Sequence, residues 1–456
     1  MARIPAPIII PIIKATDLTT GSLKKGIFNS TNLVACKTNT SHFCKKRELK
    51  VYIINANRKL YKQKRIIKNR KKMVDISERE LELPDAVIGK LLKIAVEDKS
   101  IISLGPGEPD FPLPKPIVNF VKKYANNCNH YSPPGGRMEL KEQIIKKLKR
   151  DNKIKAEPEN IIVTSGSQEA LLLATACSLD VSEQIILPNP SFMGFLPTFQ
   201  LFNANPIFVP LEEDDDFEIN PDEVRKVIDK KKTKALLINT PANPTGNVIS
   251  KNVLEELADI AVEYKIYIFC DEAYEKITYD DRKHYSIGSF NGMEKYVVTF
   301  QSFSKTYAMC GFRLGYAIGP KELIEAMTKT HIYSTISATT ISQKVGTEAL
   351  KLSNKYTEAM VQEYARRRKL ILKRLEEMNL PVAKPYGAFY AFPNIKGYSN
   401  NSLKFANDLL KKGKVAVIPG TEFGSYGEGY IRCSYATDYK LIEKAMDRLE
   451  KFLKKY

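Results

Sequence analysis

Short apolar runs alternate with amphipathic stretches along most of the chain after about residue 75. The runs are rich in Ile, Val and Leu and end in small or turn-forming residues, which predicts strands. The stretches that follow carry apolar residues at the spacing of a helix face. Three clear pairs are NIIVTSG with SQEALLLATACSL, EQIILPNP with FMGFLPTFQLF, and KALLINTPANPTG with KNVLEELADIAVEY. This alternation predicts βαβ units, and therefore an α/β domain with a mainly parallel sheet.

Two further regions flank the alternating pattern. Helical spacing predicts helices over residues 82–98 and 115–127 before it, and a largely helical segment over 322–376 after it. The stretches GAFYAFPNI, VAVIPGTEF and GYIRCSYA then predict a C-terminal α+β region. With 456 residues, the chain is long enough for one large domain and a smaller companion.

The positive charge of the chain is concentrated in its first 72 residues. The whole sequence carries a formal net charge of +19, but residues 1–72 hold 18 Lys and Arg against two acidic residues, and the remainder holds 53 basic and 50 acidic residues. Three interpretations of this leader stay open. It is a disordered extension, with Met73 as an alternative start, or a targeting segment, or a basic patch for a nucleic acid or a membrane surface. The balanced main body gives no reason to expect a nucleic-acid partner.

Composition argues against several other classes of protein. The seven cysteines are scattered without a CxxC pair, and the four histidines form no HxxxH motif, so we expect neither a disulfide framework nor a metal site. No run of eighteen apolar residues occurs, so we expect no membrane-spanning helix. Free thiols fit a reducing compartment, and we predict a cytoplasmic protein unless the leader directs it to an organelle.

Polar residues that could carry chemistry follow the predicted strands. In an open parallel sheet, ligands bind at the carboxyl ends of the strands. The residues 164–168 after NIIV open a helix with small side chains, which suits either a helix cap or an anion site. Asp271 emerges from the apolar run KIYIFC, where a carboxylate needs a cationic partner, and Tyr274 lies three residues further on.

Lys305 lies in the mostly small and apolar stretch SFSKTYAMCGFRLGY. A lysine in such surroundings, near another fixed cation, becomes available as a nucleophile towards carbonyl groups. Arg313 suits bidentate binding of phosphate, and Ser302 adds a hydroxyl. A lysine nucleophile, a phosphate site and a buried carboxylate at one sheet edge match the aldehyde, phosphate and ring nitrogen of pyridoxal 5′-phosphate.

The same stretch, with NPTG and DEAY upstream, resembles the fold-type I aminotransferases of class I and II, the aspartate aminotransferase superfamily. The resemblance runs from about residue 75 to the C-terminus. It implies a large three-layer α/β/α domain that binds pyridoxal 5′-phosphate, and a smaller α+β domain built from N- and C-terminal segments. The implied division is a leader over 1–72, small-domain segments over 73–122 and 339–456, and the large domain over 123–338.

The resemblance also implies roles for the residues that hold the cofactor. Lys305 matches the lysine that bonds the cofactor aldehyde as a Schiff base and moves the substrate proton. Asp271 matches the partner of the ring nitrogen, and Asn243 and Tyr274 match the two groups that bind the phenolic oxygen. The phosphate cup would consist of Ser167, Gln168, Ser302 and Arg313. Phe192 matches an aromatic side chain that stacks on the ring, with an ordinary core phenylalanine as the alternative.

Three more residues are implied to bind substrate or to join subunits. Arg432 matches the arginine that binds the substrate α-carboxylate, with a surface ion pair as the alternative, and Gly107 and Asn243 lie beside it in the substrate site. Tyr131 resembles the tyrosine that reaches the phosphate of a neighbouring subunit, which implies a homodimer with shared active sites.

The function implied is an aminotransferase that passes an amino group from an L-amino acid to a 2-oxo acid, 2-oxoglutarate in the first instance, by a ping-pong mechanism. Aspartate is the first donor considered, with aromatic or alanine-type amino acids next. The alternatives are a C–S lyase or an aminocyclopropane carboxylate synthase on the same scaffold. A more distant alternative is a DNA-binding regulator with an aminotransferase-like domain, in which the leader would supply the DNA-binding module.

Overall fold

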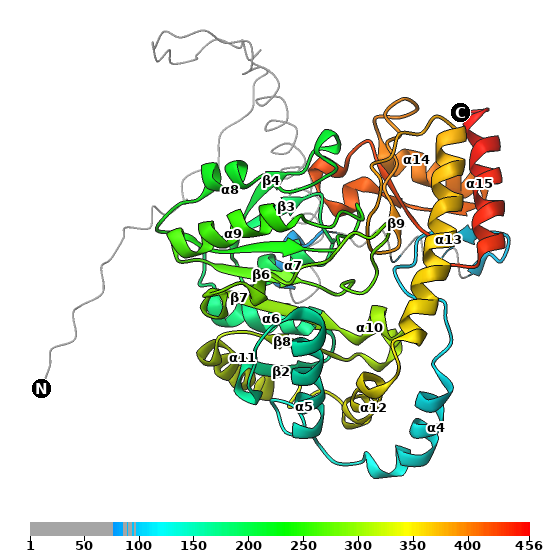
Figure 1. Cartoon of the computed structure of the whole chain (residues 1–456). Helices are drawn as coiled ribbons and strands as arrows, with labels where there is room; N and C mark the ends of the chain where they lie inside the picture. The colour runs from blue at the N-terminus through cyan, green and yellow to red at the C-terminus, as the bar shows by residue number, and fades with distance from the viewer. Residues whose placement is uncertain (1–75, 85–88, 90–93, 95–96) are drawn as a thin grey trace, which may run out of the picture. The chain divides into compact units, whose positions relative to one another are not determined.

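A seven-stranded sheet lies at the centre of the computed structural model, which describes residues 76–84, 89, 94 and 97–456 (Figure 1). The strands lie in the order β2, β8, β7, β6, β5, β3, β4. β8 runs antiparallel to both its neighbours, whereas β7, β6, β5, β3 and β4 pair in parallel, so the prediction of a mainly parallel sheet is confirmed. The bounds are β2 Ile161–Thr164, β3 Gln184–Asn189, β4 Asn205–Pro210, β5 Thr233–Asn239, β6 Tyr267–Asp271, β7 Val297–Ser302 and β8 Gly315–Ile318.

Helices cover both faces of this sheet because successive strand residues point to opposite sides. Leu237 and Phe269 pack with α6 (Ser167–Ser178), α7 (Phe195–Leu201) and α11 (Lys321–Ser334), while Leu236 and Ile268 pack with α8 (Pro221–Val227) and α9 (Lys251–Tyr264). At the β2 and β8 end of the second face, α4 (Lys115–Tyr124), α5 (Met138–Lys147) and α12 (Thr340–Lys351) form a further core. The three-layer architecture is therefore confirmed.

A second, smaller group of elements surrounds two short sheets. β1 (Ile102–Ser103) pairs in parallel with β10 (Val415–Ala416), and β12 (Ile431–Ser434) lies between β11 (Ile418–Pro419) and β9 (Tyr390–Ala391). α13 (Lys355–Glu377) and α15 (Tyr439–Leu453) pack side by side over their core, with α14 (Ser402–Asp408) close to β11 (Figure 1). The β1 and β10 pairing joins a segment early in the chain to one near its end.

The domain limits stay a prediction. Ile76–Tyr456 forms one unit, which includes the short helix α2 (Glu78–Glu82). The helices α4 and α12 lie at the predicted domain limits, and both pack in the same core as α5. The leader over 1–72 and most of the helix predicted over 82–98 lie outside the described residues. No helix in the described part of the chain has the length and apolar character needed to cross a membrane.

The structure also corrects details of the helical prediction. The segment over 322–376 is divided into α11, α12 and α13, with breaks at residues 335–339 and 352–354. β8 was not predicted: it has only four residues, and its first two, Gly315 and Tyr316, belong to the Lys305 stretch, which was analysed for its chemistry. β8 nevertheless matters for the fold, since it inserts between β2 and β7 and fills that edge of the sheet.

Candidate active site

A cavity of about 230 Å³ lies at the carboxyl ends of β5, β6 and β7. Because neighbouring parallel strands end at the same edge, residues that are far apart in sequence meet there. All the predicted site residues except Tyr131 line this cavity: Gly107, Ser167, Gln168, Phe192, Asn243, Asp271, Tyr274, Ser302, Lys305, Arg313 and Arg432.

Asp271 is the last residue of β6 and is half-buried where it lines the cavity. It lies in register with Asn239 of β5, and the Ala273 N–H donates to its Oδ1 at 3.0 Å. Burial raises the pKa of Asp271 to about 6; Glu272 acts in the same direction, and the Ala273 N–H and Lys305 act against it. The described residues give this carboxyl no ion pair, so it suits a protonated ring nitrogen of a ligand.

Lys305 follows β7 on the short helix α10 (Phe303–Thr306). The Ser302 hydroxyl caps this helix by accepting from the Ser304 N–H at 3.2 Å. The Lys305 ammonium donates to the Gly107 carbonyl and lies 6.0 Å from the centre of the Tyr274 ring. Its position beside Asp271 and Tyr274 is the one required to bond an aldehyde carried by a ligand in this cavity.

The amino end of α6 forms an anion site at the opposite side of the cavity. Gly166 precedes α6 with φ +89° and provides no side-chain cap, so the first-turn N–H groups face outward from the helix. A Cβ at Gly166 would lie 2.6 Å from Nη2 of Arg313, so glycine is what allows the guanidinium to cover this helix end. This cup fits a phosphate group. The Gln168 side chain donates to the Gly194 carbonyl and the Thr198 hydroxyl, while its backbone belongs to the first turn of α6, so its place in the phosphate cup stays a prediction.

Arg432 is a buried cation on β12 with 2% of its surface exposed. Its Nη1 donates to Oδ1 of Asn243 at 3.0 Å and its Nη2 to the Gly105 carbonyl at 2.6 Å, while Nε has no partner. Burial lowers its pKa from the ordinary arginine value. Among the described residues, no carboxylate pairs with it. The alternative of a surface ion pair is therefore wrong, and the guanidinium suits a ligand carboxylate.

Two residues of the site were missed in the sequence. The Tyr390 hydroxyl lies 2.7 Å from that of Tyr274, and the Tyr390 ring lies 4.5 Å from the Arg432 guanidinium. A Cβ at Gly107 would come within 2.6 Å of the Tyr390 hydroxyl, which explains the glycine. Asn239 donates to the Asp271 carbonyl and accepts from the Asn243 N–H. Asn239 ends a strand, which was the available signal; Tyr390 looked like one more aromatic core residue.

Phe192 and Tyr131 differ in their relation to the cavity. Phe192 lines it beside Met193 and packs edge-on against Phe195, with ring centres 5.3 Å apart. Tyr131 is 79% exposed and lies outside the cavity of its own subunit. Its predicted role at the phosphate thus requires a second subunit.

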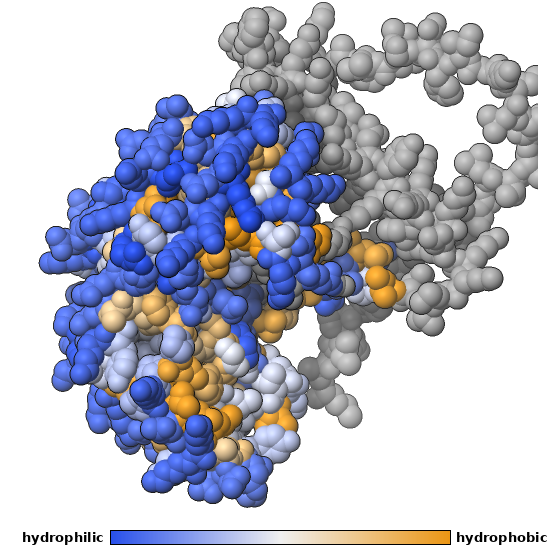
Figure 2. Space-filling model, turned by 90° about the vertical axis from the view of Figure 1, so that its right-hand side faces the viewer, coloured by the Kyte–Doolittle hydropathy of each residue, from blue (hydrophilic) through white to orange (hydrophobic). Residues whose placement is uncertain are grey.

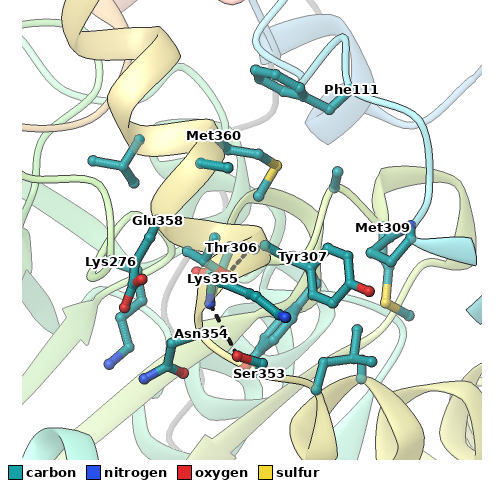
Figure 3. A pocket seen from close by; sticks show the side chains of 18 of the residues that line it. Phe111, Lys276, Thr306, Tyr307, Met309, Ser353, Asn354, Lys355, Glu358 and Met360 are labelled. Atoms are coloured by element: carbon teal, nitrogen blue, oxygen red, sulfur yellow. Dashed lines mark hydrogen bonds between the residues drawn. The ribbon is translucent and has the colours of Figure 1, made fainter. Parts of the chain in front are cut away.

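A larger cavity of about 950 Å³ lies behind the Lys305 segment and contains none of the predicted site residues. Figure 3 shows it between Phe111, Tyr307, Met309 and the start of α13, where the Thr357 hydroxyl donates to the Thr306 carbonyl at 3.1 Å. Figure 2 views the side of the molecule that carries α13, where apolar residues gather in the lower half. The walls of this larger cavity hold lysines and carboxyls, but Lys276 and Asp151 pair with each other at 2.9 Å, and the cluster around Lys305 lines the smaller cavity, which is therefore the candidate site.

A buried polar cluster lies near the site on the other side of β6. Glu272, Glu275 and His284 offer donor atoms within 4.8 Å of one another, a spacing that a metal ion could bridge. Protein donors already occupy these carboxylates: Lys147 pairs with Glu275, and Asn152, Ser286 and Gln301 donate to one or both. An ion would have to displace them, so the cluster gives no reason to add a metal to the prediction.

These residues fit pyridoxal 5′-phosphate at each of its functional groups, and the class of protein that such a sheet edge defines is a fold-type I pyridoxal-phosphate enzyme. Sequence comparison agrees with the geometry. The chain belongs to the aminotransferase class I and II family, whose model matches residues 99–449. It is therefore a pyridoxal-phosphate-dependent aminotransferase, and the predictions of family, cofactor and enzyme class are confirmed.

The alignments with individual relatives cover almost the whole length of each relative. An aspartate aminotransferase from Pyrococcus abyssi is 46% identical over 371 residues, which is 80% of this chain and 95% of that protein. Aromatic-amino-acid aminotransferase 2 from Thermococcus litoralis is 42% identical over 83% of this chain and 98% of its own. A solved structure of aspartate aminotransferase from Thermus thermophilus with maleate has a TM-score of 0.80 at 33% identity, and covers 83% of this chain and 100% of that one.

The raised pKa of Asp271 predicts a pH-dependent stability in the cofactor-free protein. The folded protein favours the protonated form of Asp271. The contribution of this protonated carboxyl to the free energy of unfolding is therefore fully present below the unfolded pKa near 4, and it is lost as pH rises through about 6. We expect cofactor-free Asp271→Asn to exceed the wild type in unfolding free energy by on the order of 2 kcal/mol near pH 8, and by little near pH 4. Urea titrations measure this, with the exposed Asp259→Asn as control. An equal difference at both pH values would contradict the assignment.

Proposed function

We propose that Arg432 binds the α-carboxylate of an L-amino acid while Lys305 moves the proton at its Cα, so that the amino group is passed to a 2-oxo acid in a ping-pong cycle. The observation that carries this proposal is the buried Arg432 guanidinium with only neutral acceptors, in the same cavity as Lys305. A substrate carboxylate offers two oxygens in the plane of the guanidinium fork and would replace the Gly105 carbonyl. This fixes the Cα–H bond towards the lysine.

The chain between Gly105 and Gly107 contacts both cations. Its two carbonyl groups accept from Arg432 and Lys305, respectively. These two hydrogen bonds hold the cations in place, but a neutral carbonyl leaves their positive charge uncompensated. A carboxylate substrate is therefore the stronger partner for Arg432. Lys305 would act as a base only in its neutral amine form, after its proton has left.

The remaining polar residues would orient and polarise the cofactor. Asp271 would keep the ring nitrogen of the bound cofactor protonated, and the cofactor would supply the electron-withdrawing ring. Tyr274 and the amide nitrogen of Asn243 would donate to the phenolic oxygen; Oδ1 of Asn243 already accepts from Arg432, which turns the donor side of this amide away from the guanidinium. Ser302 and Arg313 would bind the phosphate together with the amino end of α6.

Aspartate is the first amino donor that we propose, supported by relatives named as aspartate aminotransferases. One observation favours aromatic donors as a second candidate. The cavity wall around Phe192, Phe195 and Tyr390 is apolar, and its lining cations, Lys305, Arg313 and Arg432, all have a proposed partner already. A relative is named as an aromatic-amino-acid aminotransferase. A distal carboxylate would need a further cation from the neighbouring subunit.

We also propose that the enzyme is a homodimer in which Tyr131 reaches the phosphate of the partner subunit. The exposed Tyr131 lies outside its own cavity, and other exposed apolar side chains occur on the segments bonded to its loop: Met138, Ile332, Tyr333 and Ile336. Burial of such side chains is a main source of dimer affinity. The five described cysteines are free thiols, which supports a cytoplasmic location.

Replacement of Arg432 tests the carboxylate assignment. Arg432→Lys keeps a positive charge but removes the planar fork, so we expect kcat/KM for the amino donor to fall by about 100-fold. The absorbance of the bound cofactor should persist, since Arg432 does not hold it. Steady-state kinetics measure the first quantity and titration with cofactor the second. Arg366→Lys, a change on the exposed face of α13, serves as control; normal kcat/KM in the Arg432 variant would refute the assignment.

A panel of amino donors tests the substrate and the reaction together. With 2-oxoglutarate as acceptor, we expect glutamate to form from aspartate, and kcat/KM for aspartate to exceed that for phenylalanine and tyrosine. The reverse order would favour the aromatic candidate. Pyruvate and ammonia appearing from an amino acid without any acceptor would instead indicate the lyase chemistry of the alternative scaffold enzymes.

A further inference from the structure

His331 is a fully buried histidine at the end of α11, outside the cofactor cavity. Its Nδ1 lies 2.9 Å from the carbonyl oxygen of Pro134. Because a carbonyl can only accept, Nδ1 carries the hydrogen of this bond. Pro134 belongs to the Tyr131 loop, residues 130–136, which carries the exposed tyrosine of the proposed dimer contact. One side of the buried ring thus holds the loop.

The other side of the ring faces the helix of the phosphate cup. Nε2 of His331 lies 3.3 Å from Oε2 of Glu169, which is in the first turn of α6. This contact has the distance of an ion pair without the geometry of a hydrogen bond, and it is attractive only with a protonated imidazole, because a neutral ring would turn a lone pair towards the carboxylate. His331 therefore bridges two elements through opposite ring nitrogens.

Glu169 is itself fixed beside the cup. Its Oε2 accepts from the Ser165 N–H at 2.6 Å, and its Oε1 accepts from the Thr335 hydroxyl at 2.8 Å. Burial raises the pKa of Glu169, but His331, Ser165 and Thr335 together lower it to about 2, so the carboxylate is charged at neutral pH. Ser165 directly precedes Gly166, where the amino end of α6 is open for the phosphate. A continuous set of contacts thus leads from the cup to the Tyr131 loop.

Other contacts hold the loop to different parts of the fold. The Val163 N–H donates to the Gly135 carbonyl, and the Thr340 hydroxyl donates to the His130 carbonyl. A Cβ at Gly136 would lie 2.4 Å from Val163, so the loop is pressed against β2. These contacts fix the loop to β2 and α12 and do not involve the first turn of α6. The contact through His331 does involve the first turn of α6, and it therefore links the loop to the phosphate cup.

We propose that His331 is a positioning residue that couples the phosphate cup of one subunit to the loop with which that subunit reaches its partner. This inference rests on the proposed dimer with Tyr131 at the neighbouring phosphate. Phosphate bound at the amino end of α6 restrains the turn that carries Glu169, Glu169 and His331 transmit this restraint to Pro134, and the loop presents Tyr131 in the position that the partner's cup requires. Cofactor binding and dimer formation then favour each other by the same factor, as thermodynamic linkage demands.

Two isosteric variants separate the two halves of the bridge. Asparagine places its amide nitrogen where Nδ1 was, so His331→Asn keeps the bond to Pro134 and loses the contact with Glu169. Glutamine places its amide nitrogen where Nε2 was, so His331→Gln keeps Glu169 and loses Pro134. Asp259→Asn changes an exposed residue on α9, outside the Tyr131 loop, and serves as the control.

The measurement is the dimer dissociation constant with and without pyridoxal 5′-phosphate, by fluorescence-detected sedimentation. We expect the cofactor to tighten the wild-type and control dimers, and this factor to fall by about tenfold in both His331 variants, within the range usual for coupled sites. Without cofactor, His331→Asn should dimerise like the wild type and His331→Gln more weakly. The thermal midpoint of each variant shows that it is folded.

Different results overturn different proposals. An unchanged cofactor effect in both folded variants would refute the role of His331 and leave the dimer proposal standing. A wild type that stays monomeric with cofactor bound would refute the shared site itself, and the coupling with it. A variant that weakens the dimer equally with and without cofactor would show that His331 only supports the loop, which also refutes the coupling.

Discussion

The parallel register of β5, β6 and β7 is the constraint on which the site depends. Asn239 pairs with Asp271, and Asp271 pairs with Phe300, so the three strands reach one sheet edge together. Residues after each strand therefore share a cavity, although they are about thirty residues apart in sequence. A shift of one strand by a single residue would turn Asp271 to the opposite face of the sheet. The chemistry is thus positioned by backbone hydrogen bonds deep in the large sheet.

The second sheet contributes a charge that the first cannot supply. β12 brings Arg432 to the cavity from near the C-terminus, and the Gly105 carbonyl that it contacts comes from the segment after β1. The buried guanidinium, the ammonium of Lys305 and the carboxyl of Asp271 are each held by neutral groups and not by one another. Burial of charged groups in this manner costs stability, and the compensation comes from ligands of the opposite charge. This arrangement suits an aminotransferase, because the cofactor phosphate and the substrate carboxylate are anions and the protonated ring nitrogen of the cofactor is a cation.

The sequence predicted the parallel sheet and most of the cavity because both follow from local patterns. Apolar strand runs alternate visibly with helical stretches, and Lys305, Asp271 and Arg313 lie in short motifs. Tyr390 could not be predicted in the same way, since its role arises from a hydroxyl contact with Tyr274, 116 residues away. The side-chain contacts of Gln168 with Gly194 and Thr198 could not be predicted either, because they join two segments that lie about thirty residues apart. Contacts that depend on tertiary packing leave little trace in a local pattern.

The central claim is that Lys305 is the amine that bonds the cofactor. The most direct measurement is reduction of the holoenzyme with borohydride, followed by digestion and mass spectrometry of the peptides. We expect one phosphopyridoxyl group per chain, attached to Lys305 in the peptide that contains SFSK. A modified lysine elsewhere, or a cofactor that leaves unreduced with no peptide labelled, would contradict it.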